Sequence, residues 1–227
     1  MFVQDFQVIE KKRFYLSLFI PFIFVLLLWL IHLTSYLFDL DFSHLGVYPL
    51  HVKGIPGIFL SPLIHGNFEH LISNSLPLLV LGTMLFYFYP TSALKVFVLI
   101  YFVTGIWVWF GARPAFHIGS SGIVYGMASF IFTCGALLSN IRLMAVSLLV
   151  VFLYGSLIWG VFPIDWRISW ESHLSGFVLG VVLAFIYKNE NYYPENKPEW
   201  LNEEEKEEEG TDNEIPYWLN DDTTNIT

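Results

Sequence analysis

Long runs of apolar residues, separated by short polar segments, make up most of the chain between residues 14 and 187. A helix needs roughly 20 apolar residues to cross a bilayer core of about 30 Å. Runs of about this length predict six transmembrane helices: Phe14–Leu33, Leu71–Tyr89, Leu94–Gly111, Ser121–Leu138, Leu143–Phe162 and His173–Tyr187. The fold class that follows is an all-α membrane protein, a polytopic bundle of six transmembrane helices.

The first run is predicted to be a retained span. Phe14–Leu33 carries no charge, follows the basic triplet Lys11-Lys12-Arg13, and contains only Pro21 as a helix-breaking residue, which a membrane helix tolerates. A cleaved signal peptide would have an apolar region of only about 7–15 residues followed by small residues. This run is longer, and no small-residue cleavage site follows it.

The loop at residues 34–67 is the one long connection between predicted spans. Its glycines and prolines predict an irregular path with room for a short interfacial helix: Gly46, Pro49, Gly54, Pro56, Gly57 and Pro62.

Composition and charge support a membrane protein with an acidic appendage. Hydrophobic residues make up 55% of the chain and charged residues 14%, against about 25% charged in a typical soluble domain. Thirteen of the 20 acidic residues follow Tyr187, against three lysines, so this tail carries a charge of −10 and the remainder +1. The near-neutral body makes nucleic acid an improbable partner. The single cysteine, Cys134, excludes an intramolecular disulfide.

Lysine and arginine placement predicts that both termini are cytoplasmic. In that orientation eight basic residues lie inside, and only Lys53, Arg113 and Arg167 lie outside. The predicted organisation is a cytoplasmic segment at 1–13, a six-span core at 14–188, and an acidic, disordered cytoplasmic tail at 189–227. Three roles are open for the tail: regulation, recruitment of a partner, or simply keeping the C-terminus out of the membrane. We favour the last.

Polar residues cluster at the start of the second, fourth and sixth spans, where such side chains are costly and therefore candidates for function. These three spans run in the same direction, so the clusters share one depth near the outer surface. The first cluster contains His70 and Asn74, the second Gly119, Ser120, Ser121, Gly122, Tyr125 and Gly126, and the third His173, Gly176 and Gly180.

Each cluster alone has an ordinary structural explanation. Gly-x-Ser-Gly is common at helix entries, a histidine near a span end is often an interfacial anchor, and Gly-x-x-x-Gly usually means close helix packing. Together they provide the parts of an acyl-transfer site. If Gly176 and Gly180 pack on the helix that contains Gly122 and Gly126, His173 comes within reach of Ser121.

A serine–histidine dyad is the economical interpretation of this set. His173 would be the base for Ser121, and the positive end of the Ser121 helix suits a developing oxyanion. Tyr125, one turn below Ser121, would stack on the His173 ring. We expect no carboxylate to complete a triad, because Asp165 and Glu171 precede His173 in a loop and are interpreted as solvated charges.

The order and spacing of these motifs resemble those of the rhomboid family of intramembrane serine proteases, over roughly Phe14–Lys188. The resemblance implies a protease that cuts transmembrane substrates near the outer membrane surface, with Ser121 as nucleophile and His173 as base. Asn74 and His70, with the Ser121 backbone N–H, would line the oxyanion site, and Ser120 belongs to the same supporting group. No metal or organic cofactor is implied. Partners would be transmembrane protein substrates and the lipid bilayer, and the oligomeric state stays open.

This sequence departs from many members of that family at one point. They carry a Trp-Arg pair in the loop between the first two spans, whereas the Trp-Arg pair here, Trp166-Arg167, precedes the sixth span. The shape of the 34–67 loop is therefore open. By analogy with compact six-span members, the expected location is a bacterial plasma membrane.

Two other functions remain open. One is a catalytically inactive relative that binds client membrane proteins, since a fold alone does not fix a function. The other is a small transporter, which is disfavoured because transporters usually bind near the midplane between repeated halves.

Overall fold

The computed structural model describes residues 2–141, 143–145, 148–149, 160–164 and 168–190. Most of the predicted fifth span, Leu143–Phe162, lies outside these residues, as do Asp165, the Trp166-Arg167 pair and the tail from residue 191. Within them the chain is helical, apart from loops and one isolated β-bridge.

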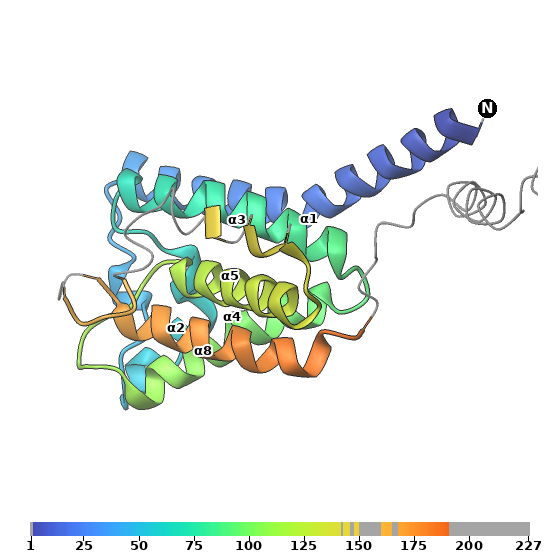
Figure 1. Cartoon of the computed structure of the whole chain (residues 1–227). Coiled ribbons are helices and arrows are strands. Elements are labelled where there is room, and N and C mark those ends of the chain that lie inside the picture. The colour runs from blue at the N-terminus through green and yellow to red at the C-terminus, as the bar shows by residue number, and fades with distance from the viewer. Residues whose placement is uncertain (1, 142, 146–147, 150–159, 165–167, 191–227) are drawn as a thin grey trace, which may run out of the picture. The chain divides into compact units, whose positions relative to one another are not determined.

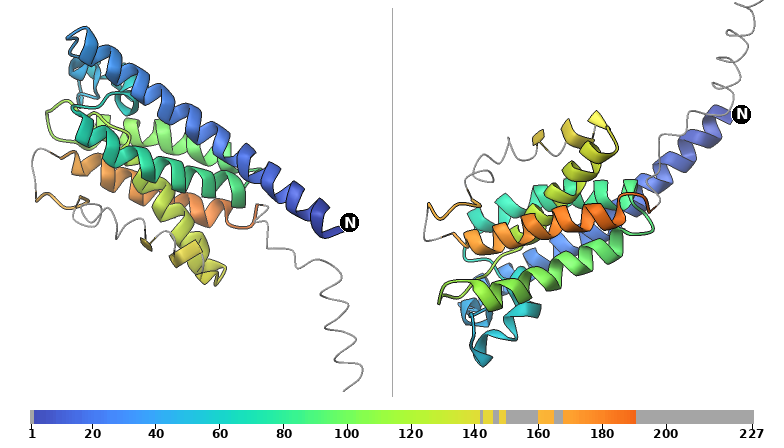
Figure 2. Two further views of the ribbon diagram at one scale, coloured as in Figure 1. Left: turned by 90° about the horizontal axis from the view of Figure 1, so that it is seen from above. Right: turned by 60° about the horizontal axis from the view of Figure 1, so that its bottom comes forward.

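The long helices of the described residues pack lengthwise in a bundle (Figures 1 and 2). They are α1 (Phe2–Leu37), α3 (Phe68–Phe88), α4 (Ala93–Gly111), α5 (Ser121–Leu137) and α8 (Trp170–Tyr187). Val8–Leu37, α3, α4 and α8 are long and apolar enough to span a membrane. The predicted all-α membrane bundle is thereby confirmed. Helices α3 and α8 each begin three residues earlier than predicted. For α3 the reason is a cap, because the Asn67 side chain accepts a hydrogen bond from the His70 backbone N–H at 2.7 Å.

Helix α5 is the central element of the bundle. It has 17 residues, about 25 Å at 1.5 Å per residue, so it is shorter than the bilayer core. Every residue from Ser121 to Ile131 is buried. The helix contacts α3, α4 and, most extensively, α8.

Glycines determine how closely α5 and α8 approach. A Cβ at Gly176 would lie 2.0 Å from the Gly122 carbonyl oxygen, and a Cβ at Gly180 would lie 2.1 Å from that of Gly126. Only hydrogen fits at these positions, so backbone meets backbone. Ser129 of α5 adds a hydrogen bond from its hydroxyl to the Phe177 carbonyl at 2.9 Å.

Helix α1 packs along α3, with its Pro21 ring filling the space over Gly82. The Trp29 indole N–H donates to the Ser75 hydroxyl at 3.1 Å. This contact satisfies a polar group that would otherwise be unpaired between two apolar helices.

The loop between α1 and α3 is irregular, as predicted, and contains one short α-helix, α2 (Gly57–Leu60), with three 3-10 turns. These turns are η1 (Ser43–Leu45), η2 (Val52–Gly54) and η3 (Ser61–Leu63). A Cβ at Gly57 would lie 2.2 Å from the backbone of Gly46, so the loop crosses itself closely. The Trp109 indole of α4 donates to the His51 carbonyl at 3.0 Å, which holds the loop against α4.

The glycine contact predicts a large effect of one methyl group. We expect Gly176→Ala to destabilise the protein by about 1–3 kcal/mol, the usual cost of overpacking, because the Gly122 carbonyl cannot move without shifting α5. The measurement is the unfolding midpoint of the purified protein in detergent. Gly111→Ala is the matched control, since its added Cβ would meet nothing within 4 Å. Equal stability of the two variants would contradict the packing argument.

Candidate active site

Ser121 and His173 meet at one end of the bundle. Ser121 is the first residue of α5, His173 lies in the first turn of α8, and the His173 Nε2 atom is 2.6 Å from the Ser121 hydroxyl oxygen. The two residues are 9% and 8% exposed. The 2.6 Å between His173 Nε2 and the Ser121 hydroxyl oxygen is within the range at which an imidazole can take a hydroxyl proton.

The Gly160 carbonyl fixes the tautomer of His173. Its oxygen lies 2.9 Å from His173 Nδ1 and can only accept a hydrogen bond, so Nδ1 carries the hydrogen. Nε2 then has its lone pair free to accept from the Ser121 hydroxyl. A backbone carbonyl thus orients the histidine in the way that a carboxylate does in a catalytic triad.

Tyr125 stacks on the His173 ring. The ring centroids are 4.3 Å apart and the planes are inclined by 15°. Tyr125 lies one turn after Ser121 on the same face of α5, so one helix supplies both the hydroxyl and the surface against which the imidazole rests.

His70 and Asn74 lie on α3, facing the loop that enters α5. A Cβ at Gly119 would lie 2.6 Å from a carbon of the His70 ring, and Gly119 has φ +106°, a conformation that favours glycine. The buried Asn74 amide donates to the His70 carbonyl at 2.8 Å. Gly119 therefore allows the chain to pass close over His70 immediately before Ser120 and Ser121.

His65 also belongs to this site, although the sequence analysis gave it no role. Its Nε2 lies 3.1 Å from the hydroxyl oxygen of the fully buried Ser120, and its ring packs edge-on to His70 at 5.0 Å. Burial lowers the pKa of His65 to about 3, and the nearby His70 adds to the effect. The ring is therefore neutral at physiological pH. Its place five residues before His70 is the one sequence signal that could have indicated it.

The interpretation of Glu171 as a solvated loop charge is wrong. Glu171 lies in the first turn of α8, is 7% exposed, and forms an ion pair with Arg113 at 3.5 Å. Arg113 also donates to the Ile168 carbonyl at 2.6 Å. A carboxylate in the first turn of a helix is stabilised by the helix dipole, so this position suits a buried charge.

His117 connects the same loop to the start of α8. Its Nδ1 lies 2.6 Å from the hydroxyl of Ser169, the residue before α8, and its Nε2 lies 3.1 Å from the Arg113 carbonyl. Burial lowers the pKa of His117. The loop at 112–120 therefore has two contacts at the start of α8: the ion pair of Arg113 with Glu171 and the hydrogen bond of His117 with Ser169.

The first turn of α5 supplies backbone N–H groups at Ser121. Helix starts leave such donors without intrahelical acceptors and carry a partial positive charge, which suits an oxyanion. Among the described residues, no group of three or more His, Cys, Asp or Glu side chains could hold a metal ion. The groups that the structure brings together at this site are the Ser121 hydroxyl, the His173 imidazole and the backbone N–H groups of α5.

The lowered pKa of His65 predicts acid sensitivity. Between pH 6.5, the ordinary pKa of histidine, and about pH 3, His65 binds a proton in the unfolded chain but not in the folded one. Stability should therefore fall with falling pH, by at most about 1.4 kcal/mol per pH unit for this one group. Unfolding measured from pH 7.5 to 5 should show a shallower slope for His65→Gln. The exposed His44 provides the control variant, His44→Gln. A slope unchanged by His65→Gln would refute the assignment.

Comparisons with known proteins identify the family of this chain. Residues 53–190 match the rhomboid domain family. An uncharacterized protein of Mycobacterium tuberculosis is 33% identical over 176 residues, which cover 72% of each chain. An uncharacterized protein of Mycobacterium leprae is 30% identical over 195 residues, 79% of this chain and 73% of that protein. The chain is a multi-pass integral membrane protein that belongs to the rhomboid family.

Proposed function

We propose that this protein is an intramembrane serine endopeptidase that cleaves transmembrane segments of membrane proteins with the dyad Ser121 and His173. The observation that carries the proposal is the 2.6 Å contact between the Ser121 hydroxyl and His173 Nε2. The hydrogen bond from His173 Nδ1–H to the Gly160 carbonyl supports it, because it leaves Nε2 as a base.

In the acylation step, the Ser121 oxygen forms a bond to the carbonyl carbon of the scissile peptide while His173 Nε2 takes the hydroxyl proton. The imidazolium then gives this proton to the leaving amine nitrogen as the peptide C–N bond breaks. Because Nδ1–H stays bonded to the Gly160 oxygen throughout, the carbonyl dipole stabilises the transient positive charge.

Negative charge on the tetrahedral intermediate requires donors at Ser121. The backbone N–H groups at the start of α5 are the primary donors. Asn74 and His70 are proposed to support them with side-chain donors, and the His65–Ser120 hydrogen bond would keep the entering loop in place.

In the deacylation step, His173 takes a proton from a water molecule whose oxygen attacks the acyl-enzyme ester. The Ser121 oxygen leaves with the proton returned by His173, and the new carboxyl terminus departs. We propose that this water enters below the loops around residues 112–118 and 163–172, and that the substrate enters beside the fifth span. Residues 165–167 and most of the fifth span lie outside the described residues.

The proposed setting is a bacterial plasma membrane, with residues 1–13 and the acidic tail, 189–227, in the cytoplasm and the active site near the outer surface. The excess of Lys and Arg on the side of the termini supports this orientation. The choice of membrane rests on the analogy with compact six-span members of the family.

The first test is cleavage of a labelled single-span substrate by the purified protein in detergent. We expect Ser121→Ala and His173→Ala each to lose cleavage by about 10³-fold or more, as in other serine proteases, with the unfolding midpoint retained. Fluorophosphonate labelling of Ser121 separates a protease from an inactive client-binding relative, which would not react. Undiminished cleavage by Ser121→Ala would rule out Ser121 as the nucleophile.

The stacked ring of Tyr125 gives a second prediction. Tyr125→Phe keeps an aromatic surface under His173 and should retain most of kcat, whereas Tyr125→Leu should lower kcat roughly tenfold, because a loosely held imidazole spends less time in line with Ser121. Both variants are compared at saturating substrate, with KM measured in parallel. A larger loss for Phe than for Leu would contradict the stacking role.

A further inference from the structure

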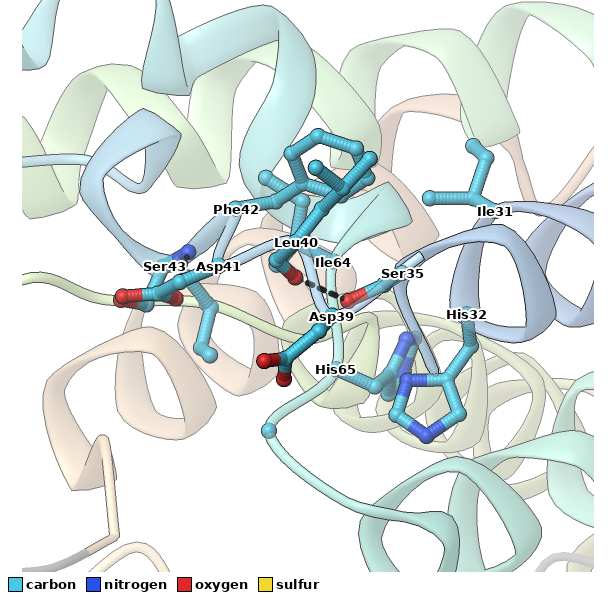
Figure 3. A pocket seen from close by; sticks show the side chains of 12 residues that line it. Ile31, His32, Ser35, Asp39, Leu40, Asp41, Phe42, Ser43, Ile64 and His65 are labelled. Carbon is cyan, nitrogen blue, oxygen red and sulfur yellow. Dashed lines mark hydrogen bonds between the residues drawn. The ribbon is translucent and has the colours of Figure 1, made fainter. Parts of the chain in front are cut away.

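A pocket of about 260 Å³ lies at the end of the bundle that holds the dyad, between the C-terminal end of α1 and the segment that enters α3 (Figure 3). Its polar lining includes His32 and Ser35 of α1, Asp39 and Asp41 of the following loop, and His65. One water occupies about 30 Å³ of liquid, so the pocket has room for a whole side chain.

The pocket carries negative charge. Asp39 and Asp41 are both exposed carboxylates, and the Ser43 side-chain and backbone hydrogen bonds hold the pKa of Asp41 below its usual value. None of the described lining residues is Lys or Arg. A cationic ligand would therefore meet two carboxylates without competition from a Lys or Arg of the lining.

His32 gives an independent sign of a missing partner. The residue is 7% exposed, and its Nδ1 atom is buried without a hydrogen-bond partner among the described residues. The ring packs edge-on against Phe68, with centroids 4.6 Å apart, which fixes its orientation at the pocket. Buried polar atoms in native proteins are nearly always paired, so an external group is expected here. In its neutral form an imidazole nitrogen accepts from an ammonium or guanidinium N–H.

The pocket lies close to the reacting serine. His65 lines it and also bonds to Ser120, which directly precedes Ser121. An extended substrate advances about 3.3 Å per residue, so a side chain a few residues from the scissile bond can reach the pocket.

We propose that this pocket is a substrate subsite that accepts a Lys or Arg side chain in the outer juxtamembrane segment of the substrate, a few residues from the scissile bond. The inference rests on the proposed protease function. Asp39 and Asp41 provide the charge, and His32 provides a hydrogen-bond acceptor. Because outer segments are poor in Lys and Arg, a subsite for such a residue would select a small share of membrane proteins.

The test uses the full-length protein and a lysine scan of a single-span substrate. One Lys is moved through the outer juxtamembrane segment, with Gln at the same position as reference, and kcat/KM is measured for each. At one or two adjacent positions we expect Lys to exceed Gln by roughly three- to tenfold, within the usual net contribution of a single hydrogen bond, because the two carboxylates are exposed to solvent. The preference should disappear in Asp39→Asn/Asp41→Asn and fall in His32→Leu. Glu69→Gln, which removes an exposed charge outside the pocket, should keep it.

Binding of the same substrates to Ser121→Ala separates this inference from the proposed function, since binding needs no nucleophile. A Lys preference in binding that depends on Asp39 and Asp41 supports the subsite, even if the protein neither cleaves nor reacts with fluorophosphonate. Cleavage with no Lys preference at any position overturns the subsite and leaves the protease intact. A Lys preference equally reduced by Glu69→Gln also overturns it, because the effect would then be general surface charge.

Discussion

The distance between the backbones of α5 and α8 is the constraint on which the site depends. Helices are nearly rigid over a turn or two, so the contacts of Gly122 with Gly176 and of Gly126 with Gly180 fix how far apart the helix starts can lie. Lipid chains are as apolar as the helices, so burial of apolar surface gives little drive for association in a membrane, and close packing of small residues takes its place. The Ser121–His173 hydrogen bond thus depends on nearby glycines, whose lack of a Cβ lets the two helices approach closely.

The membrane surroundings of the helices also explain why His173 is oriented without a charged partner. An ionised carboxylate is costly inside a membrane protein unless it is fully paired. The Gly160 carbonyl fixes the His173 tautomer with a dipole alone. The charge that is retained nearby, Glu171, lies at a helix N-terminus and beside Arg113, where both the dipole and the ion pair compensate its burial.

The sequence predicted those features that depend on spacing along one element. Apolar run length predicted the four described helices that are long and apolar enough to span a membrane, and a spacing of four residues placed Ser121 and Tyr125 on one face of α5. The sequence also predicted the contact between Ser121 and His173, which are 52 residues apart, because both lie in motifs at the starts of spans that run in the same direction. It missed remote contacts whose partners belong to no such motif. His65 and Ser120 are 55 residues apart, and Arg113 and Glu171 are 58 apart. Neither pair forms a local pattern, so His65 was missed and Glu171 was assigned to solvent.

The loop between α1 and α3 shows why remote contacts matter for this site. The loop contains no Trp-Arg pair, and one of its remote contacts is made by backbone atoms: Val47 and His117 exchange two backbone hydrogen bonds, at 3.0 and 2.9 Å. The side chain of the same His117 contacts Ser169 at the start of α8. One residue therefore links the irregular loop on one side to the helix that carries His173 on the other. The bonds to Val47 use only backbone atoms, so this link does not depend on the chemistry of the side chain at position 47. The neighbouring Gly46 and Gly57 are restricted, since a Cβ at either would clash with backbone atoms.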